Sequence, residues 1–158
     1  MSRRTNHPPP SDLLAGGIDY DILPDLLGFH LRRAQISVFS RFGRVIARDG
    51  ITPGQFGILA VIGGNDSLTQ SALSKAMGVE RSTMVAVIDS LEGKGLVERR
   101  PSPDDRRSYA LALTDDGKTL LARLKRKVRD HERRVMEDFT EEERRQLVDL
   151  LRRVWAGW

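Results

Sequence analysis

Apolar residues recur at steps of three and four from about residue 22 onward. The repeating face of residues 22–48 consists of Leu23, Leu27, His30/Leu31, Ala34, Val38, Phe42 and Val45/Ile46. This spacing predicts one long amphipathic helix, which we expect to end near Asp49-Gly50. Residues 1–19 lack such spacing, and their prolines, glycines and polar residues cannot bury enough apolar surface to offset the entropy of ordering. We therefore expect a flexible arm there.

Capping residues and glycines predict three short helices between residues 52 and 95. The first two open on a threonine that can accept a backbone N–H bond, and a proline follows the first threonine, where its fixed φ suits a helix. Glycines follow each helix and favour its termination. We expect the first helix from Thr52 to Gly63-Gly64, the second from Thr69 to Gly78, and the third from about Arg81 to Glu92, before Gly93 and Gly95.

After residue 95 the apolar pattern changes to alternation. Residues 96–100 and 108–113 predict the two strands of a β-hairpin, with residues 101–107 as its tip. Thr114 then opens a further helix, because Asp115 and Asp116 follow it in the first turn, where the helix dipole favours acids.

Two amphipathic helices are predicted after the hairpin. The first shows a four-three-four-three spacing typical of a coiled-coil seam, and the second opens on a capping box of Thr140 and Glu143. Together with the N-terminal helix they carry more apolar surface than one small DNA-binding unit needs, so we expect a homodimer. Their apolar positions are Leu121, Leu124, Val128, His131 and Val135, then Leu147, Leu150/Leu151, Val154 and Trp158.

Composition narrows the class of protein. The 158 residues are 39% apolar, enough for one domain with a buried core, and include no cysteine, which excludes disulfides, thiolate catalysis and zinc–thiolate sites. No apolar stretch approaches ~20 residues and prolines stand where a signal peptide would need one, so we expect a soluble, cytoplasmic protein with no membrane partner. The net charge of +4 permits nucleic-acid binding without proving it.

The chain carries no recognisable catalytic motif. It lacks a P-loop, Rossmann glycines, H-E-x-x-H and G-x-S-x-G, and none of His7, His30 and His131 has a nearby nucleophile or metal-ligand spacing. We therefore expect no enzymatic activity, no cofactor and no metal site.

Residues 70–92 predict a helix-turn-helix. Its second helix can enter a major groove only if its outer face is slim and polar near the N-terminus while its other face packs. Serine, threonine and arginine can bond base edges or phosphates, and small apolar side chains can contact thymine methyls. The outward residues are Arg81, Ser82, Thr83, Val85 and Ala86, and the inward residues are Met84, Val87, Ile88 and Leu91. A plain helical hairpin of a bundle shares this pattern.

The hairpin that follows favours DNA binding. Its tip carries Arg106 and Arg107, and Arg99 and Arg100 lie on the strand that leads to it. A narrow A·T-rich minor groove attracts inserted arginines, so a basic tip beside a recognition helix suits a wing. Taken alone, the tip also fits a solvated turn in which Asp105 pairs with Arg107. In tandem, the two features predict binding to double-stranded DNA.

The predicted fold is mainly α with a small β-hairpin wing. We expect the arm at residues 1–19 and one domain at residues 20–158. Within that domain, residues 52–113 would form a winged helix-turn-helix, and residues 20–51 and 114–158 would form flanking dimerisation helices.

The run ERSTMVAVIDSLEGKGLVERRPSPDDRRSYALALTDDG resembles the multiple antibiotic resistance regulator (MarR) family. The resemblance extends from about residue 22 to the C-terminus and includes the D-R-R and LT-x-x-G patterns. It implies a dimeric repressor that binds a pseudo-palindromic operator and is released by a small aromatic ligand. It also implies DNA contacts by Ser82, Thr83, Ala86 and Arg107. Many members have an arginine where this chain has Ala86, so we expect shape and methyl contacts to carry more of the specificity.

The resemblance implies a ligand pocket between the first long helix, the short helix after it and the base of the fifth. An aromatic acid or its coenzyme A thioester would suit aromatic walls with polar anchors, and a basic face near Arg32, Arg33, Arg123 and Lys127 could hold phosphates. The same aromatic residues also fit a helical core. The candidates are His30, Arg33, Phe39, Phe42, Phe56 and Leu59.

Two other binding functions stay open at the level of sequence. A ligand-independent architectural protein would bind random and operator DNA equally, with a steep salt dependence. A winged module that binds another protein would show no DNA binding even at low salt.

Overall fold

The chain folds as a set of helices with one two-stranded antiparallel hairpin. The computed structural model describes residues 17–101 and 109–156. These residues form two units, divided between Ser37 and Val38, and each unit is described by itself. Most of the predicted N-terminal arm lies outside the described residues.

The first unit contains a short turn and the start of the long N-terminal helix. The 3-10 helix η2 spans Leu23–Asp25, and α1 spans Leu27–Ile46. The predicted helix began at residue 22, which is too early. Pro24 lacks a backbone N–H and fits the tight turn, so the regular helix begins only after it.

In the second unit, local capping sets the helix boundaries as predicted. α1 runs into the 3-10 helix η3 (Ala47–Asp49), which ends at Gly50 with φ +67°. Thr52 and Gln55 form a capping box at the start of α2, and Thr69 caps α3. The helices are α2 at Pro53–Ile62, α3 at Gln70–Met77 and α4 at Arg81–Gly93.

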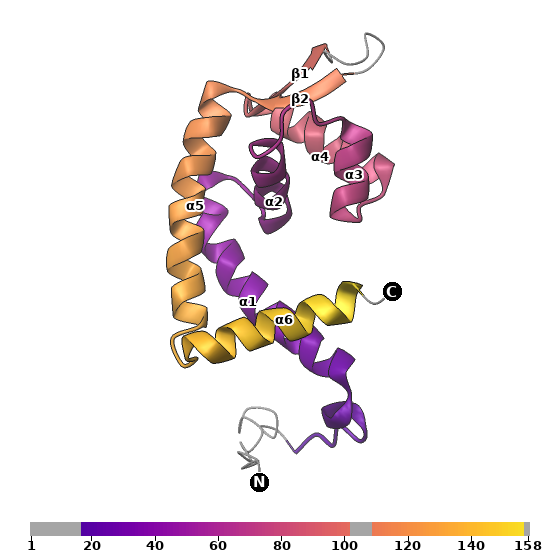
Figure 1. Cartoon of the computed structure of the whole chain (residues 1–158), viewed down its shortest axis with the longest axis vertical. Coiled ribbons are helices and arrows are strands. Elements are labelled where there is room, and N and C mark those ends of the chain that lie inside the picture. Colours follow the sequence, from indigo (N-terminus) through magenta and orange to yellow (C-terminus); the bar gives the residue numbers. More distant parts are fainter. Residues whose placement is uncertain (1–16, 102–108, 157–158) are drawn as a thin grey trace. The chain divides into compact units, whose positions relative to one another are not determined.

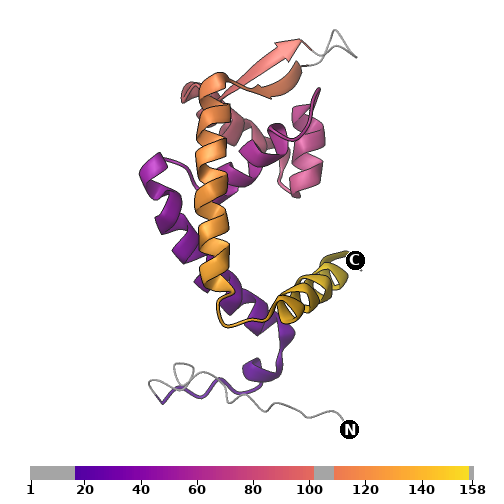
Figure 2. The ribbon, with the colours of Figure 1, turned by 60° about the vertical axis from the view of Figure 1, so that its left-hand side comes forward.

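The hairpin lies against the short helices at the N-terminal end of α5. Strands β1 (Val97–Pro101) and β2 (Tyr109–Leu113) pair with Val97 opposite Leu113. Figures 1 and 2 show the hairpin beside α3, α4 and the start of α5 from two directions. The Leu111 N–H also donates to the Leu68 carbonyl at 2.8 Å, which ties β2 to the segment before α3. The C-terminal helices are α5 at Asp115–Val135 and α6 at Glu141–Ala156.

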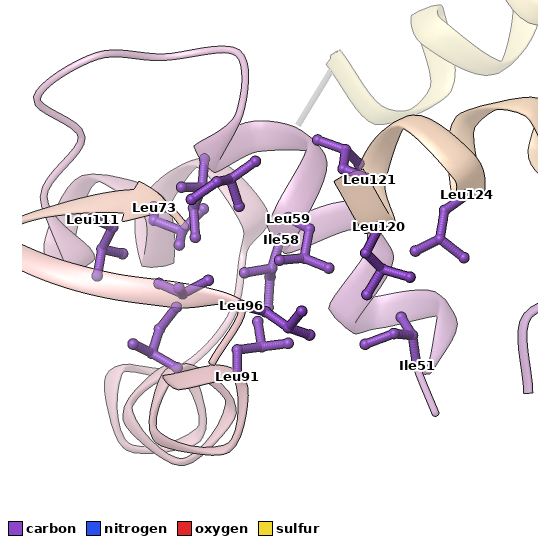
Figure 3. Close-up of a cluster of buried hydrophobic side chains, with 14 of the residues drawn as sticks. Ile51, Ile58, Leu59, Leu73, Leu91, Leu96, Leu111, Leu120, Leu121 and Leu124 are labelled. Carbon is purple, nitrogen blue, oxygen red and sulfur yellow. The ribbon is translucent and has the colours of Figure 1, made fainter. Parts of the chain in front are cut away.

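One apolar core joins the short helices, the hairpin and α5. Leu59, Leu73 and Leu91 are 0% exposed, and Figure 3 shows side chains from α2, α3, α4, the hairpin and α5 converging on one cluster. Burial of this surface stabilises the unit by roughly 25 cal/mol for each Å² removed from water. The core therefore fixes α4 and the hairpin relative to one another.

The seam of α5 packs within its own chain. We expected a coiled-coil seam to face a partner, but Leu121 and Leu124 are 4% and 0% exposed in the single chain. They belong to the core shared with α2, so a partner is not needed to cover them. These two leucines are covered by their own chain, and the part that α5 plays in dimerisation stays a prediction. By contrast, no residue of α6 that the structure describes is buried.

No single helix among the described residues is both long and apolar enough to cross a membrane. Residues 27–49 and 53–62 meet that test only as a bent pair. In the second member of this pair, Ile58, Leu59 and Ile62 are buried in the core.

Candidate nucleic-acid interface

The first turns of α4 present a small, exposed outer face. The exposed residues are Arg81, Ser82, Thr83, Val85 and Ala86. On the opposite face, Met84, Ile88 and Leu91 are 0% exposed. This is the division of faces predicted from the sequence. Because the inner face is anchored in the core, the outer face is held on a rigid helix.

The turn between α3 and α4 connects the two helices tightly. Gly78 adopts φ +61°, a left-handed conformation that favours glycine, and the Val79 N–H donates to the Ser74 carbonyl at 3.1 Å. Arg81 then donates through Nη2 to Ser71 Oγ at 3.1 Å. Arg81 therefore bridges α3 and α4 at the N-terminus of the predicted recognition helix.

Arg99 joins the wing to the predicted recognition helix. Its guanidinium donates to Asp89 Oδ1 at 2.7 Å, to Glu92 and, at 3.4 Å, to Gln70 Oε1. These partners belong to α4 and α3, and the Arg99 side chain is 28% exposed. Its DNA contact stays a prediction, while the structure gives it a positioning role. Asp89 and Glu92 stand three residues apart on one helical face, so one guanidinium group can reach both.

The LT-x-x-G segment forms the joint between the wing and α5. Thr114 Oγ1 accepts the Gly117 N–H at 3.0 Å and donates to the Gly95 carbonyl at 2.6 Å. Gly117 lies so close to the backbone of Leu96 that an added Cβ would collide with the Leu96 carbonyl oxygen. The threonine and the glycine therefore fix where the last strand of the wing meets the helix.

The outer end of the wing is described only in part. Arg106 and Arg107 lie outside the described residues, and their contact with DNA stays a prediction. Arg100 is exposed and donates through Nε to Glu98 Oε1 at 2.9 Å. Tyr109 pairs with Pro101 at the outer end of the strands and is 62% exposed. We did not single it out from the sequence, although an aromatic residue directly after a basic tip is a signal for a nucleic-acid contact.

Two predicted ligand residues lie in the first unit, and both have local partners. His30 Nε2 donates to the Pro24 carbonyl at 2.7 Å. The Arg33 guanidinium carbon lies 5.8 Å from the centre of the Phe29 ring, a cation–π distance. These contacts stabilise the start of α1. The ligand role of His30 and Arg33 stays a prediction.

The other predicted ligand residues lie in the second unit, and two of them meet there. The Phe42 ring lies 5.6 Å from Phe56, edge to face, and 5.6 Å from His131, stacked. Leu59 is 0% exposed, as expected of a core residue, whereas Phe39 is 51% exposed. The structure thus adds His131 to the aromatic set of Phe42 and Phe56. Phe39 differs from these residues because half of its side chain is exposed. We predicted His131 as a core position and not as part of a ligand site.

Within residues 17–101 and 109–156, no cluster of histidine and carboxylate side chains is arranged to hold a metal ion. The face of α4 and the wing instead combine guanidinium groups, hydroxyl groups and small apolar side chains. Such groups suit the phosphates and base edges of a duplex.

Comparisons with known proteins agree with this geometry. The MarR family model matches residues 49–108, which contain α2, α3, α4 and β1. The putative transcriptional regulatory protein for the hcr operon of Thauera aromatica is 41% identical over 156 residues, which are 98% of this chain and 93% of that protein. This chain belongs to the MarR family. It is a transcriptional regulator, and these relatives are regulators and not enzymes.

Solved structures of MarR-family regulators share most of the fold. The repressor CouR bound to a 23-mer DNA duplex is 38% identical, with a TM-score of 0.82, and the match covers 87% of this chain and 97% of CouR. CouR bound to p-coumaroyl-CoA is 34% identical, with a TM-score of 0.82, and covers 89% of this chain and 99% of CouR. The fold class predicted from the sequence, a mainly helical winged helix-turn-helix with flanking helices, is confirmed.

Proposed function

We propose that this MarR-family regulator is a homodimeric repressor that binds a pseudo-palindromic operator and leaves it when an aromatic acid or its coenzyme A thioester binds. The observation that carries the proposal is the exposed outer face of α4, anchored by a buried inner face and joined to the wing by Arg99. A helix held in this way can enter a major groove while the wing reaches the adjacent minor groove. The DNA-bound structure of CouR supports this role.

The outer face of α4 suits a particular kind of readout. Arg81 is its only long donor, Ser82 and Thr83 offer short hydroxyl groups, and Ala86 offers only a methyl group. We therefore expect phosphate contacts, duplex shape and thymine methyls to contribute more than paired hydrogen bonds to guanine. The contacts of Arg106 and Arg107 with the minor groove belong to the same proposal.

An aromatic effector is supported by one relative and by the core of the second unit. CouR has been solved with p-coumaroyl-CoA, an aromatic thioester. In this chain Phe42, Phe56 and His131 form a contiguous aromatic set next to the junction of α1 and α5. Aromatic side chains in contact with a few polar groups are typical of small-molecule sites.

A second copy of the chain would cover the apolar surface that one copy leaves exposed. On α6, Leu150 is 53% exposed and Trp155 is 71% exposed. In the first unit, Ile22, Leu27 and Ile36 are 60%, 59% and 54% exposed. Apolar helix faces of this kind mark protein–protein interfaces. We assign dimerisation to these faces and not to the seam of α5.

Binding to a selected duplex tests the proposal. A duplex selected from a random 23-bp library would be labelled, and its affinity compared with that of a scrambled duplex by fluorescence anisotropy at several salt concentrations. We expect a preference of about 10³-fold or more for the selected duplex. Adding p-coumaroyl-CoA or p-coumarate should then release it.

Two outcomes would contradict the proposed function and indicate a different one. Equal affinity for both duplexes with a steep salt dependence would identify an architectural DNA-binding protein. Absence of binding at low salt would identify a protein-interaction module. Specific binding that no aromatic acid or thioester alters would refute the ligand-release part alone.

A further inference from the structure

A basic pocket lies between the C-terminal end of α1 with η3 and the C-terminal half of α5. Its volume is about 380 Å³, within the range of roughly 300–1,000 Å³ of small-molecule pockets. All of its lining residues belong to the second unit. They are Arg44, Val45, Arg48, Lys127, Asp130, His131 and Arg134.

The carboxylate that lines this pocket and the one that pairs with its lysine both have partners. Asp130 pairs with Arg133. Asp49 accepts from Lys127 at 2.6 Å and from Arg123 at 3.0 Å. Arg44, Arg48 and Arg134 have no hydrogen-bond or ion-pair partner within residues 17–101 and 109–156. Three uncompensated guanidinium groups therefore surround one pocket.

A buried histidine lines the same pocket. His131 is 7% exposed, and its ring stacks on Phe42 at 5.6 Å. Its Nε2 is buried without a hydrogen-bond partner in the described part of the chain. Buried polar atoms are almost always bonded, so an unpaired one indicates a place where another group binds. His131 thus connects the basic pocket to the aromatic set of Phe42 and Phe56.

We propose that this pocket is an anion site that takes phosphate groups of the effector thioester. The inference rests on the proposed function and names the residues that would bind the coenzyme A portion. Planar guanidinium groups bind phosphate oxygens through paired, charge-assisted hydrogen bonds. Three of them suit a multiply charged phosphate better than a single carboxylate, because one carboxylate would leave most of the positive charge uncompensated.

This assignment differs from the basic face expected from the sequence. Arg123 and Lys127 of that face are engaged by Asp49, whose side chain is 6% exposed. Arg33 lies over the Phe29 ring. The unpaired arginines that line the pocket are instead Arg44 on α1, Arg48 on η3 and Arg134 on α5.

Calorimetric titration of the DNA-free protein tests the site. The probes are p-coumaroyl-CoA, free coenzyme A, inorganic pyrophosphate and p-coumarate. The variants are Arg44→Gln, Arg48→Gln and Arg134→Gln. We expect each variant to raise the dissociation constants of p-coumaroyl-CoA and coenzyme A about tenfold, while p-coumarate binding is unchanged. Arg41→Gln, an exposed arginine of the same helix outside the pocket, is the matched control and should change neither.

The results separate the pocket from the proposed function. Thioester binding that is equal in the wild type and all three variants would overturn the phosphate site and leave ligand release intact. If the wild type binds no thioester, the proposed effector class fails, and pyrophosphate binding that the variants abolish would still support the anion site. If pyrophosphate and coenzyme A also fail to bind, the pocket is refuted. Loss of operator affinity with unchanged thioester affinity would reassign it to the DNA backbone.

His131→Phe tests the histidine separately. Phenylalanine keeps a ring against Phe42 but removes the unpaired nitrogen, so the thermal midpoint should stay the same or rise. Thioester affinity should fall several-fold if the nitrogen bonds the ligand. An unchanged affinity would show that His131 is only a packing residue and would remove it from the site.

Discussion

Among the glycines that the structure describes, Gly117 leaves the least room for a side chain. An added Cβ would meet the carbonyl oxygen of Leu96 and stand 3.0 Å from its carbonyl carbon. Because these are backbone atoms, relief requires the hairpin or α5 to move. We expect Gly117→Ala to lower the free energy of unfolding by about 3 kcal/mol, the upper part of the usual range for overpacking.

Chemical denaturation of the variant checks this prediction. Gly93→Ala is the matched control, because nothing lies within 4 Å of the position its Cβ would take. The control should change stability little. If Gly117→Ala is as stable as the wild type, the backbone between the wing and α5 can shift to make room for the added methyl group.

Asp49 makes the stability of the second unit depend on pH. The hydrogen bond from Lys127, aided by the charges of Lys127 and Arg123, holds the pKa of Asp49 below its usual value near 3.8. A pKa lowered by folding contributes stability fully above the unfolded pKa, and this contribution is lost as the pH falls through the folded pKa. We expect Asp49→Asn to cost about 1–2 kcal/mol at pH 7.

Denaturation from pH 7 down to pH 2 tests the sign of this effect. The difference in stability between the wild type and Asp49→Asn should narrow as the pH falls below the usual aspartate pKa of 3.8 and through the lower pKa of folded Asp49. Asp115→Asn removes an exposed pair with Lys118 and serves as control, with a smaller expected change at pH 7. A stability difference that does not change with pH would mean that Asp49 stabilises the fold through packing and not through its charge.

At the scale of elements, Arg99 links the wing to α4 through Asp89 and Glu92. If its main role is to hold β1 to Asp89 and Glu92, the double variant Asp89→Asn/Glu92→Gln should weaken operator binding by about 1 kcal/mol, roughly fivefold. If Arg99 mainly contacts phosphate, removal of two acids should strengthen binding and steepen its salt dependence. We expect the weaker binding. Anisotropy titrations at several salt concentrations distinguish the two results.

The tip of the wing makes a separate contribution. Replacing Arg106 and Arg107 with alanine should weaken operator binding by about 1–3 kcal/mol for each well-formed arginine–DNA interaction that is removed, while the dimer stays intact. Binding and sedimentation should be measured on the same preparation. Unchanged affinity would refute the assignment of these arginines to the minor groove.

Helix boundaries could be predicted because their chemistry is local. Thr52, Thr69, Thr114 and Thr140 each bond a backbone N–H three residues ahead, so the signal lies within one turn of chain. The same holds for the exposed and buried faces of α4, which follow from the helical period. The early start predicted for α1 failed because Pro24 overrides that period.

The partners of Arg99 and the pairing pattern around the α1–α5 pocket could not be predicted in this way. Arg99 bonds Gln70 across 29 positions, and Lys127 bonds Asp49 across 78. Charge patterns alone could not distinguish Lys127, which is paired, from Arg134, which is not. Such pairings depend on how the helices pack, and no local pattern records that packing.

At the scale of the whole molecule, a regular apolar helix face indicates that the helix packs against another surface. It does not show whether that surface belongs to the same chain or to a partner. The stripes of α5 and α6 look alike in sequence, yet Leu124 is 0% exposed and Leu150 is 53% exposed in the single chain. Leu124→Asp would place a carboxylate in the core, so we expect it to unfold the chain. It therefore does not test dimerisation.

Leu150→Ser/Trp155→Ser tests dimerisation without disturbing the core. Both side chains are exposed in one copy, so the fold should persist, whereas an interface that buries them should lose about 2 kcal/mol or more per residue. Light scattering should show a monomer, and operator affinity should fall because two recognition helices are no longer held ~34 Å apart. Asp149→Ser, an exposed polar position on the same helix, should change neither. A double variant that stays dimeric and binds the operator would place the interface elsewhere than α6.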